Sequence, residues 1–141
     1  MARELTVHAS YQGGMHFLAT TRDHALHVDY PLQEGDQGAG FTSLELLLAS
    51  LATCCGNTVG VVLRQMRREF DGIVVDARGE RRDEHPTVLT RIELELEVRG
   101  EGLDQATVER ALHIAEEQLC PVWAMLKPGT PITASVRVTT E

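Results

Sequence analysis

The sequence predicts a single α+β domain, mainly of antiparallel sheet, around one long central helix. The segment 42–68 is apolar almost all round through its first half, which indicates a buried helix in a globular protein. Runs of alternating apolar and polar residues before and after it give the order three strands, helix, two strands, helix, strand. Since similar strand–helix–strand units do not repeat, we expect α+β architecture with the other elements wrapped around the central helix.

Length and charge narrow the possible partners. The 141 residues are 43% apolar, enough for one domain with its own core. The formal net charge is −8 and basic residues form no long run, so we expect neither nucleic acid nor an anionic membrane as a partner. We count no apolar stretch of the roughly 18 to 20 residues that span a bilayer, and no signal-peptide pattern at the start. These features predict a cytoplasmic protein whose thiols are kept reduced.

The first part of the chain predicts a three-stranded meander over residues 3–30. Apolar residues alternate from Leu5, and Gly13-Gly14 marks a turn before the alternation resumes. The segment 35–40 (GDQGAG) has the composition of a flexible loop and lacks the spacing of a phosphate-binding loop.

The central helix is expected over residues 42–68. The spacing of Thr42 and Glu45 is that of a capping box, in which each side chain bonds the other residue's backbone amide. Ala52, Gly56 and Gly60 then form a row of small residues, although each glycine costs about 1 kcal/mol of helix propensity. Our hypothesis is that a second helix crosses this row, that of a twofold-related subunit. Local flexibility beside the thiols is the alternative.

After the helix, alternation predicts strands at 72–80 and 87–99, with a charged hairpin tip between them. A helical stripe predicts a second helix over 104–119, and alternation returns in a last strand over 131–139.

The three cysteines are candidate reactive groups. Cys54 and Cys55 are neighbours on a helix, so their side chains diverge by about 100° and cannot both face one small site. Cys120 precedes Pro121, which suits the first position of a short helix, PVWAML. At a helix N-cap the free amides favour thiolate, so Cys120 is the thiol that local physics makes easiest to activate. Simple packing at a helix junction is an equal alternative for Cys120.

Two cysteine motifs carry a resemblance to a known family. The run ELLLASLATC at 45–54 is followed 66 residues later (120 − 54) by CPVWAMLKPGT. This pair resembles the OsmC/Ohr family of osmotically induced and organic-hydroperoxide-resistance proteins, and the likeness extends over essentially the whole chain. The resemblance implies an OsmC-like fold, with antiparallel sheets wrapped around the central helix in an intertwined homodimer.

The resemblance also implies a chemistry: reduction of organic, and possibly hydrogen, peroxides by a cysteine pair that an external dithiol then regenerates. Aligned along the helix, the family's attacking cysteine falls on Cys54 and its resolving partner on Cys120. Alignment on the family's glutamate would shift the first match to Cys55, and that alternative stays open. A buried Cys54 needs a nearby cation to become thiolate.

The resemblance implies two further site residues. Typical peroxidases of the family have Pro-Glu early in the helix, where this chain has Ser43-Leu44 and then Glu45. Their activating arginine comes from the N-terminal region, and Arg22 is the candidate here. The alternative for Arg22 is that it is simply an exposed charge in a turn. The alternative for Glu45 is that it only caps the helix.

No cofactor or metal is expected, because the histidines are scattered and no CxxC or HxxxH spacing occurs. Trp123 and Met125 are expected to form an apolar wall beside Cys120. Two other functions stay open: a non-catalytic OsmC-like dimer that binds an apolar small molecule, and a thiol site that acts on another electrophile.

Overall fold

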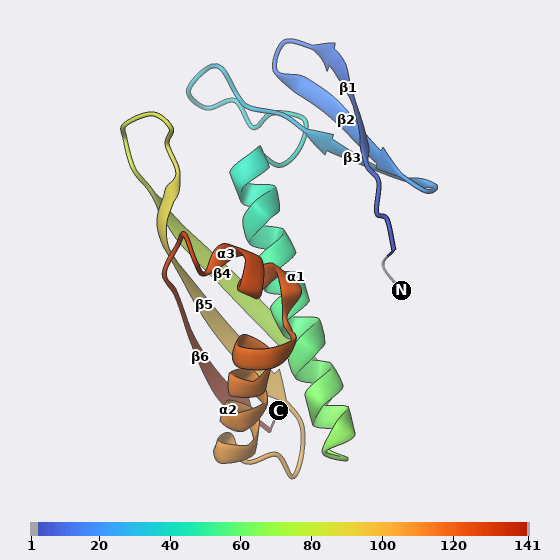
Figure 1. The fold of residues 1–141 in the computed structure, drawn as a ribbon, viewed down its shortest axis with the longest axis vertical. Coiled ribbons are helices and arrows are strands. Elements are labelled where there is room, and N and C mark those ends of the chain that lie inside the picture. Colours follow the sequence, from blue (N-terminus) through green and yellow to red (C-terminus); the bar gives the residue numbers. More distant parts are fainter. Residues whose placement is uncertain (1–2, 141) are drawn as a thin grey trace. The chain divides into compact units, whose positions relative to one another are not determined.

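The structure is a computed structural model that describes residues 3–140. The chain divides into two compact units, and the boundary between them falls between Leu47 and Leu48, inside the central helix. Figure 1 shows the N-terminal unit in blue and cyan and the C-terminal unit in green to red.

The N-terminal unit is a three-stranded antiparallel sheet. Its strands are β1 (His8–Gly13), β2 (His16–Thr21) and β3 (His24–Val28), in the order β1-β2-β3. The predicted meander is therefore confirmed, but its first strand begins at His8. Leu5 lies before the sheet and is 92% exposed, so the expected half-buried strand there is wrong. The turn between β1 and β2 uses positive φ angles at Gly13 (109°) and Gly14 (58°), which glycine adopts without strain.

The end of the glycine-rich loop is held against β3. The carboxylate of Asp29, just after β3, accepts a hydrogen bond from the Ala39 amide at 2.8 Å, and the Asp29 amide donates to the Phe41 carbonyl at 2.9 Å. A Cβ atom added at Gly40 would lie 2.0 Å from the His27 carbonyl oxygen. Only glycine allows this approach, so the loop is held against the end of β3.

The central helix α1 (Ser43–Gln65) begins and ends with recognisable caps. The capping box is confirmed: the Thr42 amide donates to Glu45 Oε1 at 2.9 Å, and the Glu45 amide donates to Thr42 Oγ1 at 3.2 Å. The helix ends earlier than predicted, because Arg67 takes a left-handed conformation (φ 60°) and the Arg68 amide returns to the Leu63 carbonyl at 2.8 Å. This pattern is a Schellman-type ending.

Helix α1 corrects the expectation that the chain has no apolar stretch long enough to span a bilayer. Its best 18-residue window has a mean hydropathy of 1.9, so the helix is long and apolar enough to cross a membrane by length and composition. In this fold it serves as a core helix: Leu51, Val59 and Leu63 are fully buried in the C-terminal unit.

The C-terminal unit contains the second sheet, in the order β4 (Gly72–Arg81), β5 (Leu89–Arg99), β6 (Ile132–Thr139). Strands β4 and β5 are antiparallel, as expected. Strands β5 and β6 are parallel, because the chain crosses over through α2 (Gln105–Ile114) between them. The expected mainly antiparallel sheet thus contains one strand–helix–strand crossover that the sequence pattern did not reveal.

One face of this sheet builds the core. The alternate β5 residues Ile92, Leu94, Leu96 and Val98 are buried, whereas the opposite face carries exposed ion pairs such as Arg137–Glu97 at 3.0 Å. The helices therefore cover the apolar face of the sheet.

The predicted helix over 104–119 is α2 followed by a π-helical turn, η1 (Ala115–Leu119). Asp104 caps α2 by accepting from the Thr107 amide at 3.1 Å. Cys120 ends the π turn and is followed directly by the short helix α3 (Pro121–Leu126), which confirms the predicted PVWAML helix.

Candidate active site

The structure brings two sulfur atoms together that lie 66 residues apart in the chain. The thiol of Cys120 donates a hydrogen bond to the sulfur of Cys54, and the two sulfurs are 3.2 Å apart. Both thiols are free. A disulfide bond measures about 2.05 Å, so the sulfurs need to move only about 1.2 Å closer to be joined.

Two elements of the C-terminal unit position this pair. Cys54 lies near the middle of α1, and Cys120 occupies the N-cap position of α3. The Cys120 amide donates to the Ala115 carbonyl at 2.9 Å, which closes the π turn before it. Trp123, one turn into α3, is 1% exposed and belongs to the core. Met125 is 80% exposed, so the expectation that it forms an apolar wall is wrong.

Cys55 lies on the buried side of the helix and is fully enclosed. Burial, with smaller contributions from the neighbouring Cys120, Cys54 and Glu116, raises the pKa of its thiol from 9.0 to about 12. Cys55 is therefore a protonated core residue near neutral pH.

Cys120 does not behave as its N-cap position predicts. Burial is the largest influence and raises the pKa of its thiol to about 11, although the amides of Trp123 and Val122 lower it. The helix terminus thus acts in the expected direction, but loss of solvent outweighs it. The expectation that Cys120 is the easiest thiol to activate is wrong.

Cys54 is the accessible member of the three. It is half-buried, whereas Cys55 and Cys120 are 0% and 1% exposed. The difference between Cys54 and Cys55 follows from the side of α1 that each occupies, since consecutive helical residues are about 100° apart. A reactant from solvent can therefore reach Cys54 more easily than either of the other thiols.

The residues that the resemblance implies as activators lie in the N-terminal unit. Arg22 lies in the N-terminal unit, exposed in the turn between β2 and β3 with a φ of 53°. Glu45, in the same unit, has the capping role described above. Their contribution to the thiol site stays a prediction.

The row of small residues on α1 has a partner within the chain. A Cβ at Gly56 would lie 3.1 Å from Val75 Cγ2, and one at Gly60 would lie 3.1 Å from Phe70 Cζ. Side chains of β4 and of the segment before it thus approach the glycines closely. Within the chain, the two glycines therefore allow β4 and Phe70 to approach α1 closely. The crossing of this row by the helix of a second subunit stays a prediction.

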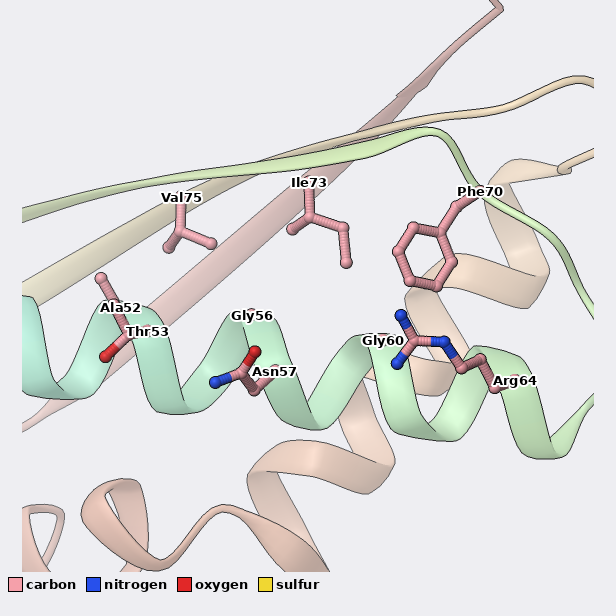
Figure 2. A pocket seen from close by; sticks show the side chains of 9 residues that line it. All are labelled: Ala52, Thr53, Gly56, Asn57, Gly60, Arg64, Phe70, Ile73 and Val75. Carbon is pink, nitrogen blue, oxygen red and sulfur yellow. The ribbon is translucent and has the colours of Figure 1, made fainter.

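A groove of about 390 Å³ runs along this row between α1 and β4, as Figure 2 shows. Ile73, Val75 and Phe70 form one side of it, and the Arg64 guanidinium lies 5.0 Å from the centre of the Phe70 ring. Neither Cys54 nor Cys120 lines the groove. The thiol pair and the groove are therefore two separate features of the helix.

The fold and the thiol pair define a class: an α+β protein whose central helix and crossover segment each contribute one cysteine to a paired thiol site. Comparison with known proteins identifies the family. Residues 35–135 match the family model described as OsmC-like protein. Protein YhfA of Escherichia coli K12 is 32% identical over 108 residues, which cover 76% of this chain and 81% of YhfA. The chain belongs to the OsmC-like family.

Solved structures agree with this assignment. The crystal structure of a hypothetical protein from Aquifex aeolicus VF5 superposes with a TM-score of 0.87 at 27% identity and covers 99% of both chains. An organic hydroperoxide resistance protein OsmC from Legionella pneumophila superposes with a TM-score of 0.73 at 18% identity, covering 98% of this chain and 99% of that one. The fold is thus the OsmC-like fold.

Sequence reasoning missed two features of the site. The π turn before Cys120 has no signal in the residue pattern, since AEEQL reads as ordinary helix. The influence of Glu116 on Cys55 was also missed. No pattern in the sequence links Glu116 to Cys55, because the two residues lie on different helical segments.

Proposed function

We propose that this protein is a thiol-dependent peroxidase that reduces organic hydroperoxides through a cycle of two cysteines. The observation that carries the proposal is the sulfur pair, in which half-exposed Cys54 lies 3.2 Å from buried Cys120. Such a pair suits an attacking thiol that meets the oxidant and a resolving thiol kept close behind it. The proposed setting is the cytoplasm, where reducing dithiols are present.

The proposed cycle has three balanced steps. The Cys54 thiolate attacks one peroxide oxygen, the O–O bond breaks, and the alkoxide takes up a proton to leave as an alcohol, with Cys54 as sulfenic acid. The Cys120 thiol then attacks the sulfenic sulfur, which forms the disulfide and releases water. An external dithiol reduces the disulfide by exchange and is itself oxidised to a disulfide.

Activation of Cys54 requires a cation, and we propose Arg22 for that role with Glu45 as its partner carboxylate. The resemblance supports Arg22, which is exposed in the turn between β2 and β3. Arg22→Ala should lower kcat/KM for the peroxide at neutral pH. Arg67→Ala, another exposed arginine with a positive φ, is the matched control.

We also propose that the protein acts as a homodimer. No residue between 3 and 50 is fully buried, and apolar side chains of the N-terminal sheet such as Phe17 and Tyr11 are exposed. A second copy would cover such apolar surface, and the groove beside α1 offers more. Light scattering should give twice the chain mass. Asn57→Arg, which adds a charge in the groove, should weaken the dimer, and Gln65→Arg on the same helix should not.

The test of the peroxidase proposal is turnover of cumene hydroperoxide with dithiothreitol as the reductant. Wild type should consume peroxide catalytically, and Cys54→Ser should abolish turnover. Cys55→Ser is the matched control, because it changes the adjacent thiol; it should retain turnover. Loss of activity in a folded Cys55→Ser, with Cys54→Ser still active, would transfer the attacking role to Cys55.

The groove favours a second candidate function, a non-catalytic dimer that binds an apolar small molecule. Its side chains from β4 and Phe70 are apolar, and it is separate from the thiols. A binding protein would show no peroxide turnover, and Cys54→Ser would leave its affinity for the ligand unchanged. A thiol site for another electrophile would instead lose its reaction in Cys54→Ser while ignoring hydroperoxides.

A further inference from the structure

A group of three metal-ligating side chains lies at the junction of α2 and the π turn η1. His113, Glu116 and Glu117 each offer one ligand atom, and these atoms all lie within 4.8 Å of one another. None of the three takes part in the proposed peroxidase cycle. His113 and Glu117 are exposed, and Glu116 is half-buried.

The local backbone explains why the three side chains converge. Residues three and four positions apart share one face of a helix, and Glu116 and Glu117 stand at those distances from His113. Ligands of a tetrahedral zinc ion lie about 3.4 Å apart when each is about 2.1 Å from the metal. Small rotations of exposed side chains therefore suffice to bring the three atoms from their present separation into contact with one ion.

Charge also favours a cation here. Two adjacent carboxylates repel each other, and none of the ion pairs described among residues 3–140 includes Glu116 or Glu117. The imidazole of His113 supplies a nitrogen ligand beside these two carboxylates. A divalent cation would neutralise the two carboxylates and use the imidazole as its third ligand.

We propose that His113, Glu116 and Glu117 bind a divalent first-row transition-metal ion of the zinc type. One imidazole and two carboxylates suit such an ion better than Mg²⁺ or Ca²⁺, which take oxygen ligands. Three protein ligands leave a coordination position open for water. Two of the three ligands lie on the π turn that ends at Cys120. It does not depend on peroxidase activity.

The test is zinc binding to the full chain, measured by competition with a chromophoric chelator. The parent protein carries Cys54→Ser and Cys120→Ser, so that the paired thiols cannot bind zinc themselves. His113→Ala and Glu117→Gln each remove one ligand. His85→Ala and Glu109→Gln are matched controls, because they change an exposed histidine elsewhere and an exposed glutamate on the same helix. Circular dichroism checks that each variant is folded.

The parent should bind one equivalent of zinc, and excess Mg²⁺ should not displace it. Each ligand variant should weaken binding by about tenfold or more, since even residues that only support a ligand contribute that much. The two controls should bind as the parent does. Absence of zinc binding in the parent, or unchanged binding in either His113→Ala or Glu117→Gln, would overturn the proposal.

Discussion

The two three-stranded sheets of this chain differ in what they bury. The sheet β4-β5-β6 buries Ile92, Leu94 and Val98 of its central strand, whereas the sheet β1-β2-β3 has no fully buried residue. The C-terminal unit therefore has its own core and assembles the Cys54–Cys120 pair from its own elements. The N-terminal unit carries Arg22 and Glu45, which we propose as activators.

The largest expected effect concerns the resolving thiol. Cys120→Ser leaves Cys54 able to attack peroxide but removes the sulfur that forms the disulfide. Turnover with dithiothreitol should fall by about tenfold or more, because the sulfenic acid persists and oxidises further to sulfinic acid. Peroxide consumption, together with the mass gain of the variant, measures this. Full turnover without overoxidation would show that Cys120 is not the resolving residue.

Leucine-to-alanine substitutions in each sheet test the difference in burial between them. Leu94→Ala in β5 should lower the free energy of unfolding by about 2 to 5 kcal/mol, because Leu94 is 1% exposed and leaves a cavity. Leu18→Ala in β2 removes a half-buried side chain and should cost about 1 kcal/mol. Urea unfolding measures both. Equal losses would mean that the N-terminal sheet has a core of its own.

Stability should fall at alkaline pH because of Cys55. Burial raises the pKa of Cys55 from 9.0 to about 12, so folding favours its protonated form. That contribution is complete below about pH 9 and is lost as the pH rises toward 12, a change of up to about 4 kcal/mol. Cys55→Ala should reduce the slope of unfolding free energy between pH 9 and the highest accessible pH. If the slope of unfolding free energy against pH is the same in Cys55→Ala and wild type, ionisation of Cys55 does not cause the loss of stability at alkaline pH.

The smallest effect is expected where α1 begins, in the N-terminal unit. Thr42→Ala removes the hydroxyl that accepts from the Glu45 amide at 3.2 Å and should cost about 1 kcal/mol of stability. Ser43→Ala, one residue further and exposed, is the control and should change little. Thermal unfolding distinguishes the two. A larger loss of stability for Ser43→Ala than for Thr42→Ala would show that Thr42 is not the capping residue.

Much of the fold was predictable because short-range patterns determine it. The alternation around Leu94 located β5, and the spacing of Thr42 and Glu45 located the start of α1. The parallel pairing of β5 with β6 was not predictable. It depends on where the chain returns to the sheet after the crossover, and no local residue pattern encodes that position. The left-handed Arg67 that ends α1 was also hidden, since glycine is the residue that normally marks such an ending.

The site was predictable only in part. The two cysteine motifs led to Cys54 and Cys120, and the structure brings those sulfurs together. The acidity of Cys120 was misjudged, because an N-cap can be read from Pro121 whereas burial depends on the whole unit. Whether Cys54 or Cys55 faces solvent could not be read from adjacent residues on an apolar helix, since that depends on the side that the sheet covers.

The most direct measurement is mass spectrometry of the Cys55→Ser variant after one equivalent of cumene hydroperoxide without reductant. This variant leaves only two thiols, so any intramolecular disulfide must join Cys54 to Cys120. The proposed cycle predicts that disulfide, with no thiol left to alkylate and a return of both thiols on addition of dithiothreitol. Folded protein that keeps two alkylatable thiols, or that carries an oxidised Cys54 beside a free Cys120, would contradict it.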